Sequence, residues 1–223
     1  MTFIQNEPKY SPFKGIVLKL GGFHTEMSFV GCIGYLMSGS GLVSILETVY
    51  AATAVAHMLT GKAIARPVRG HFLVDTALTA LIISNIYGIP TPTIDMTMNN
   101  IEPESNADSA QDREESVTYS DEITESVNLL DSFVNGETSL KDIENSKALV
   151  LVKEKMDLFR ESCKKYRTAN LWFQYMDMLA ILRQFIRAER TGDWRLHLES
   201  LKAMLPFLRP PGITFMQSLY GFI

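Results

Sequence analysis

The sequence is poor in cysteine and lacks the short motifs that mark common catalytic and nucleotide-binding sites. Its 223 residues include two cysteines, Cys32 and Cys163. Two thiols exclude a disulfide scaffold and a four-cysteine zinc site. We expect both to be reduced in an intracellular protein, either nuclear or cytoplasmic. No Gly-Lys-Ser/Thr phosphate loop, HExxH pair or Ser-His-Asp order occurs. The residues by themselves therefore indicate no enzyme.

Long uncharged apolar runs are also missing. The most apolar region, residues 27–59, is interrupted by Ser-Gly-Ser-Gly at 38–41 and by Glu47 and His57, and residues 72–89 contain Asp75. A charge at the centre of a bilayer is costly. Buried helices are therefore favoured over membrane spans, and we expect no membrane partner.

The net charge of −4 combines two unlike parts. Residues 101–145 contain 13 acidic and two basic residues, a net charge of −11, whereas the rest of the chain is +7. The acidic part is rich in Ser, Asn, Asp and Glu, which favours disorder. We therefore predict three regions: 1–98 with a strand and helices, a disordered linker at 99–145, and helices in 146–223. A short helix at 126–134 is the local exception within the linker.

Hydrophobic spacing predicts a mostly α protein with a bundle-like body. The expected 169–190 helix has an apolar stripe whose residues recur at three- and four-residue spacing: Leu171, Tyr175, Met178, Leu182, Phe185 and Ile186. Thr25, Thr168 and Asp193 are candidate helix caps, Gly61 and Gly88 suit helix ends, and Leu198, Leu201 and Leu205 share one expected apolar face. The expected helices cover residues 26–37, 42–59, 68–87, 147–165, 169–190 and 194–205. The β-branched run at 15–20 predicts one or a few short strands, which need a partner to be stable.

Two groups of basic residues are candidate nucleic-acid contacts. Lys62, Arg66, Arg69 and His71 surround the start of one expected helix. Arg183, Arg187 and Arg190 recur on one face of the 169–190 helix, followed by Trp194 and Arg195. Arginines beside an aromatic ring can hold single strands by phosphate contact and stacking. The alternative is that the basic residues form solvated helix faces and that Trp194 is a core anchor.

His24 and Glu26 are the candidate catalytic pair. They follow the expected strand and a Gly-Gly turn, a common place for a site, and a helix start there would favour anions. The alternative is a locally bonded histidine beside a surface glutamate. We predict no bound cofactor on this evidence from the residues.

Two motifs, GGFHTEM at 21–27 and AERTGDW at 188–194, carry a resemblance. With the stretches around them they resemble a large uncharacterised, transposon-derived protein family expanded in invertebrate genomes. The resemblance covers residues 20–208 except the acidic segment. Longer members resemble transposases with a ribonuclease-H-like α/β core, whose acidic residues hold divalent metal ions for phosphodiester chemistry.

This resemblance implies an incomplete active site. The chain begins about 20 residues before Gly21 and departs from the family pattern after Leu208, so the acidic residues expected on either side are not found, and only His24 and Glu26 remain. The strand at 15–20 would be a remnant of the ribonuclease-H-like core. The expected function is that of a catalytically inactive, transposase-like fragment with weak nucleic-acid binding.

Two alternatives stay open. One is a helical interaction module that binds a protein partner, or itself, through the 169–190 helix. The other is a metal-dependent nuclease or transposase, which would need a divalent metal. A further hypothesis is that the acidic linker competes with phosphate for the basic face.

Overall fold

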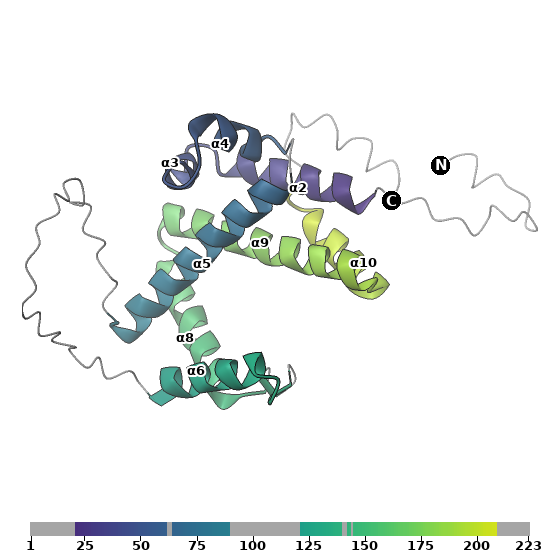
Figure 1. Ribbon diagram of the computed structural model, residues 1–223. Helices are drawn as coiled ribbons and strands as arrows, with labels where there is room; N and C mark the ends of the chain where they lie inside the picture. Colours follow the sequence, from purple (N-terminus) through teal and green to yellow (C-terminus); the bar gives the residue numbers. More distant parts are fainter. Residues whose placement is uncertain (1–20, 62–63, 90–120, 140–141, 144, 209–223) are drawn as a thin grey trace, which may run out of the picture. The chain divides into compact units, whose positions relative to one another are not determined.

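A computed structural model describes residues 21–61, 64–89, 121–139, 142–143 and 145–208. The regular structure of these residues is helical, without a strand (Figure 1). The mostly α prediction is therefore confirmed, while the strand expected at 15–20 lies outside the described residues. The helices are α2 (Gly22–Leu36), α3 (Leu42–Glu47), α4 (Ala52–Leu59), α5 (Ala65–Tyr87), α6 (Asp121–Val134), α8 (Lys147–Cys163), α9 (Arg167–Thr191) and α10 (Trp194–Met204).

The chain forms two compact units. Unit 1 comprises Met1–Thr76 and Tyr166–Ile223, and unit 2 comprises Ala77–Lys165. Unit 1 thus joins residues from both sides of the acidic segment, and α5 begins in unit 1 and ends in unit 2. The region boundaries expected at 98 and 145 were based on charge and composition, which carry no information about contacts between distant segments of the chain.

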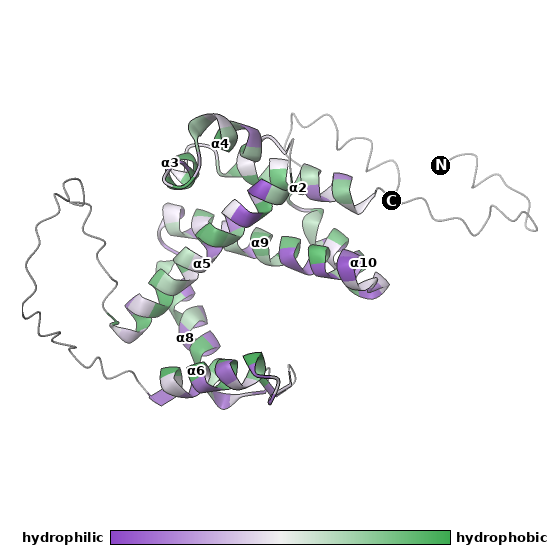
Figure 2. Ribbon diagram, in the orientation of Figure 1, coloured by the Kyte–Doolittle hydropathy of each residue, from purple (hydrophilic) through white to green (hydrophobic). Residues whose placement is uncertain are grey.

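The core of unit 1 lies around α9. Helices α2 and α10 both pack against α9, and α4 packs against α2. Figure 2 shows hydrophobic residues interspersed with hydrophilic ones along α9 and α10, as expected for helices with one buried side. The predicted α9 stripe supplies core residues that are at most 1% exposed: Tyr175, Met178, Leu182 and Phe185. The folded chain itself therefore covers most of the stripe that we considered for self-association.

Gly34 of α2 allows the close approach of α4, and Gly61 allows the turn after α4. A Cβ atom on Gly34 would lie 2.2 Å from the carbonyl oxygen of Leu59, whereas one on Gly31 would meet its nearest neighbour at 3.6 Å. Gly61 has φ +68°, a left-handed conformation that suits the predicted helix end. The contact between α2 and α4 thus depends on one missing methyl group at Gly34.

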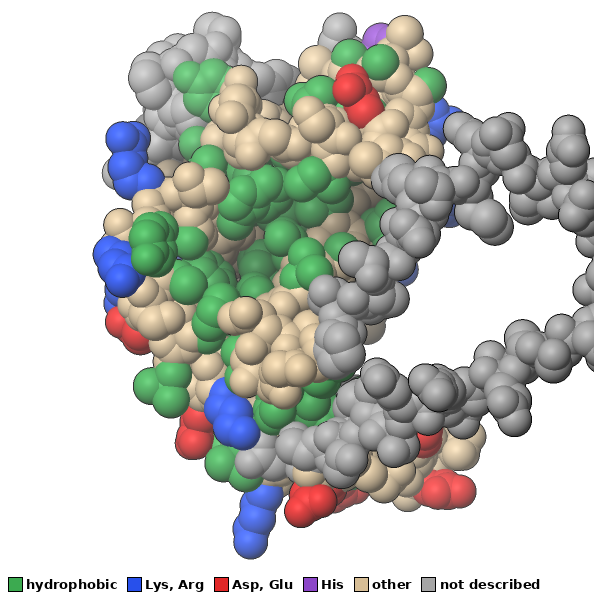
Figure 3. All heavy atoms as spheres, turned by 90° about the vertical axis from the view of Figure 1, so that its left-hand side faces the viewer, with side chains coloured by type: hydrophobic (Ala, Val, Ile, Leu, Met, Phe, Trp, Pro, Cys, Tyr) green, Lys and Arg blue, Asp and Glu red, His purple; other side chains and the backbone are tan. Residues whose placement is uncertain are grey.

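Part of the segment that was expected to be a disordered linker is helical in unit 2. Residues 121–134 form α6, which packs against α8, and Ser126 is 8% exposed. The short helix expected at 126–134 is therefore longer, while residues 90–120 lie outside the described part. Large apolar side chains, including Val134 at 81% and Leu158 at 70%, remain exposed, and Figure 3 shows hydrophobic side chains on one surface of the molecule.

Several predicted helix boundaries were wrong by up to one turn. The expected 42–59 helix is interrupted between α3 and α4. α2 begins before Thr25, and α9 begins before Thr168, so neither threonine is a cap. α5 includes Pro67, because an amide hydrogen is dispensable in the first turn of a helix. Asp193 does cap α10, since its Oδ1 accepts a hydrogen bond from the Leu196 amide at 3.0 Å.

The expected face of α10 was also partly wrong. Its buried residues are His197, Ser200 and Met204, while Leu198 is 47% exposed. Glu189 of α9 explains the buried histidine, because its Oε1 lies 2.6 Å from His197 Nδ1. The buried face of α10 therefore contains a polar residue with a partner, although the apolar pattern predicted a face of leucines.

Candidate nucleic-acid interface

Four arginines from two distant segments of the sequence surround one hollow in unit 1. The hollow has a volume of about 430 Å³. It lies between the first half of α5 and the second half of α9, and none of the acidic residues that the structure describes lines it. Its lining consists of Arg69, Arg183, Arg187 and Arg190, the apolar side chains of Val68, Phe72 and Ile186, and Thr191. The structure thus joins members of both predicted basic groups.

Arg183 is held in place by two contacts from α5. Its Nη2 donates a hydrogen bond to Asp75 Oδ2 at 2.9 Å, and its guanidinium carbon lies 4.7 Å from the centre of the Phe72 ring. The Arg183 side chain is nevertheless 56% exposed. An arginine fixed by a carboxylate and a ring loses less conformational freedom when it binds a ligand.

A buried polar pair lies beside Asp75. His71 Nδ1 is 2.9 Å from the Tyr175 hydroxyl, and both residues are fully buried. Burial lowers the pKa of His71 to about 4, and burial followed by the charge of Asp75 raises the pKa of Tyr175. Burial also raises the pKa of Asp75, although Arg183 opposes this shift. His71 is therefore a neutral core residue and does not belong to the basic group in which the sequence placed it.

The other three arginines of the hollow are exposed. Arg69 and Arg187 form no ion pair with any residue that the structure describes. Arg190 has a carboxylate in its neighbourhood, because its charge lowers the pKa of Glu26 against the larger raising effects of burial and Glu189. Arg183, Arg187 and Arg190 follow each other at helical spacing over about 10 Å of α9. The hollow thus has an excess of positive charge.

The remaining predicted contacts that the structure describes do not line this hollow. Lys62 lies outside the described residues, and Arg66 is exposed on the first turn of α5. Arg195 pairs with Glu199 at 3.0 Å. Trp194 is 47% exposed and stacks on His197, with ring centres 5.1 Å apart, so it is not the core anchor that we considered.

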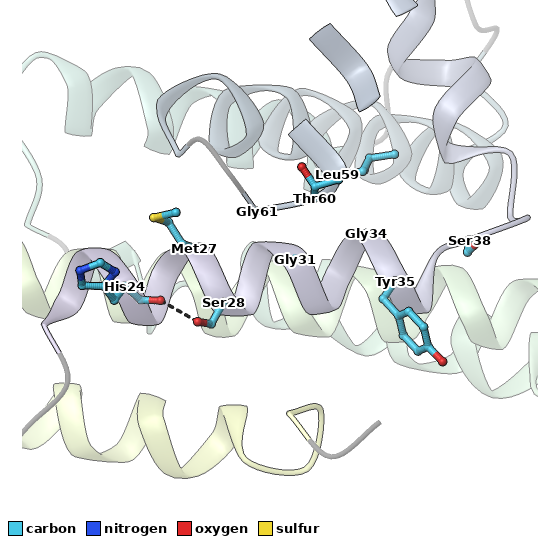
Figure 4. A pocket seen from close by; sticks show the side chains of 10 residues that line it. All are labelled: His24, Met27, Ser28, Gly31, Gly34, Tyr35, Ser38, Leu59, Thr60 and Gly61. Atoms are coloured by element: carbon cyan, nitrogen blue, oxygen red, sulfur yellow. Dashed lines mark hydrogen bonds between the residues drawn. The ribbon is translucent and has the colours of Figure 1, made fainter. Parts of the chain in front are cut away.

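His24 and Glu26 do not form a pair. They lie two residues apart on α2, a helix rather than a strand end, and therefore point to different sides. His24 is exposed and lines a second hollow, of about 620 Å³, between α2 and the end of α4. Figure 4 shows this lining, with the Ser28 hydroxyl donating to the His24 carbonyl oxygen at 2.8 Å. Glu26 lies instead near Glu189 and Arg190.

The described residues contain neither a candidate metal site nor a candidate membrane-spanning helix. They contain no group of three or more His, Cys, Asp or Glu side chains placed to hold a metal ion. No helix within the described ranges has the length and apolar character needed to cross a membrane.

These features define a helical protein with a basic hollow between two crossing helices. A family model described as a domain of unknown function (DUF8702) matches residues 1–214. The chain therefore belongs to this family, and the match includes the acidic segment, which the resemblance seen in the sequence had left out. Neither a search of curated proteins nor a search of solved structures found a match.

The apolar residues of the hollow, and the acidic residue that holds Arg183, could not be recognised in the sequence. Val68, Phe72 and Ile186 looked like ordinary helix residues, and Asp75 served only as an argument against a membrane span. Asp75 and Arg183 are 108 positions apart, so no local pattern could pair them. The available signal was weak: an acidic residue inside an otherwise apolar helix, which needs a partner.

Proposed function

We propose that the chain is a transposon-derived, catalytically inactive protein that binds nucleic acid through the arginines of the α5–α9 hollow. The observation that carries this proposal is the meeting of Arg69, Arg183, Arg187 and Arg190 around one apolar recess. Arginine forms bidentate hydrogen bonds with phosphate and is suited to planar groups. An excess of exposed arginines without an acidic lining residue favours an anionic ligand.

The transposase-like origin and the lack of catalysis rest on the sequence motifs. His24 and Glu26 lie on different sides of α2, so the proposal assigns them no joint role. A divalent metal would be needed only if the chain acted as a nuclease, and binding by the arginines requires none.

Binding of a fluorescent 20-nucleotide DNA strand at low salt, followed by anisotropy, tests the proposal. We expect Arg187→Gln to weaken binding about tenfold, the equivalent of one hydrogen bond to a charged group. Arg195→Gln is the matched control, because Arg195 lies outside the hollow and pairs with Glu199. No binding at low salt, or an equal loss in both variants, would overturn the proposal.

Deleting residues 102–144 is not a suitable test of the hypothesis that the acidic linker competes with phosphate for the basic face. That deletion would remove α6, which packs against α8. Neutralising Glu102, Glu104, Asp108 and Asp112 to their amides leaves α6 intact. A rise in affinity for the DNA strand is expected if these charges compete with phosphate, and unchanged affinity contradicts the hypothesis.

A further inference from the structure

The α5–α9 hollow is more than a basic patch, because apolar side chains of both helices line it together with the arginines. Val68 and Phe72 are one helical turn apart on α5, and Ile186 lies between Arg183 and Arg187 on α9. All three apolar residues are half-buried. Phosphate groups alone cannot use such a lining, since they gain nothing from apolar contact.

We infer that this hollow takes one unstacked base of a single-stranded nucleic acid, while the surrounding arginines hold the neighbouring phosphates. The inference rests on the proposed function and names its substrate class. A volume of about 430 Å³ falls within the range of small-ligand sites. The guanidinium of Arg183 lies over the ring of Phe72, and its side chain is 56% exposed, so a base can stack on the guanidinium plane in continuation of the ring.

A duplex fits this lining poorly. The bases of a duplex are stacked on one another. A protein that inserts no helix or strand into a groove therefore contacts mainly phosphate and sugar. A single strand can turn one base out of the stack at low cost. A lining that combines apolar side chains with arginines therefore favours a single strand. Asp75 holds Arg183 beside the Phe72 ring, where a base can contact it.

The test compares three DNA probes of equal length: a 20-nucleotide thymidine strand, an abasic strand with the same phosphates, and a 20-base-pair duplex. We expect the thymidine strand to bind about tenfold more tightly than the abasic strand, the usual range for one stacked base. Phe72→Leu keeps an apolar side chain but removes the ring, so it should weaken thymidine binding more than abasic binding and thereby reduce this difference.

Two further variants complete the test. Phe23→Leu is the matched control, because Phe23 is 61% exposed on α2 and does not line the hollow. Val68→Phe fills the hollow, so it should also weaken thymidine binding about tenfold even if Phe72→Leu fails to fold. Circular dichroism of each variant reports folding.

The outcomes separate this inference from the proposed function. Equal binding of thymidine and abasic strands, or preference for the duplex, overturns the base-binding inference and leaves phosphate binding standing. Binding of none of the three probes overturns both. If an acidic peptide competes with the thymidine strand as strongly as a second thymidine strand does, the hollow selects charge alone. That result also overturns the inference.

Discussion

At the residue scale, the buried pair of His71 and Tyr175 links the core to the arginine hollow. His71 is fully buried, and no described side chain or backbone group forms a hydrogen bond with its Nε2. A proton on this imidazole would be a buried charge, and its cost explains why the pKa falls to about 4. The neutral ring suits the core, whereas the charged ring does not.

The stability of the protein should therefore depend on pH. The unfolded chain binds a proton on His71 near its ordinary pKa of about 6.5, and the folded chain only near 4. The contribution of the neutral ring is thus complete above pH 6.5 and is lost as the pH falls toward 4, by about 3 kcal/mol in all. Urea unfolding at pH 7.5 and pH 4.5 measures this loss.

His71→Phe should make the unfolding free energy less sensitive to pH, after a loss of about 1 kcal/mol at pH 7.5 from the missing hydrogen bond. The buried His197 and Asp75 are unchanged in the variant, so the difference from the unmodified chain isolates His71. His57→Gln, at an exposed position on α4, serves as the control. A pH dependence as steep in His71→Phe as in the unmodified chain would contradict the account.

At the element scale, much of the helical structure could be predicted from the sequence. The spacing of Tyr175, Met178, Leu182 and Phe185 predicted a buried face of α9, and all four are in the core. Boundaries were harder, since Thr25 and Thr168 have cap chemistry but the helices begin earlier, and α6 formed in a segment whose composition favours disorder. Packing against α8 is a tertiary contact that local composition does not report.

Gly31 and Gly34 of α2 should respond oppositely to alanine. Gly34→Ala places a methyl group 2.2 Å from the Leu59 carbonyl oxygen, so we expect a loss of about 1–3 kcal/mol. Gly31→Ala meets only ordinary contact distances and should gain about 0.5–1 kcal/mol from helix propensity. Thermal unfolding of the pair measures both, and equal stability of the two variants would contradict the close packing of α2 on α4.

The cap of α10 provides a second test of an element. Asp193→Ala should cost about 1 kcal/mol, because the Leu196 amide loses its acceptor. Ser146→Ala is the control, since Ser146 occupies the same position before α8 without a side-chain hydrogen bond there. Chemical denaturation of both variants is the measurement, and a loss at Ser146 as large as that at Asp193 would show that the hydrogen bond is not the cause.

At the scale of the whole molecule, the sequence shows that charge is unevenly distributed, but it does not show which basic residues come together in the fold. The arginines at 183, 187 and 190 could be placed on one face from their spacing alone. Their meeting with Arg69, Phe72 and Asp75 depends on the crossing of α5 and α9, which are separated along the chain by α6 and α8. Contacts between distant segments follow from the fold and leave no periodic signal.

The slope of binding affinity against salt concentration tests the central claim most directly. A single-stranded 20-nucleotide DNA is titrated between 25 and 200 mM salt, about the range in which released counterions dominate the affinity. Each neutralised phosphate adds about 0.7 to the slope of log affinity against log salt. The triple variant with glutamine at Arg69, Arg187 and Arg190 should therefore have a slope shallower by about 2. Equal slopes in the unmodified chain and the triple variant would contradict binding through this hollow.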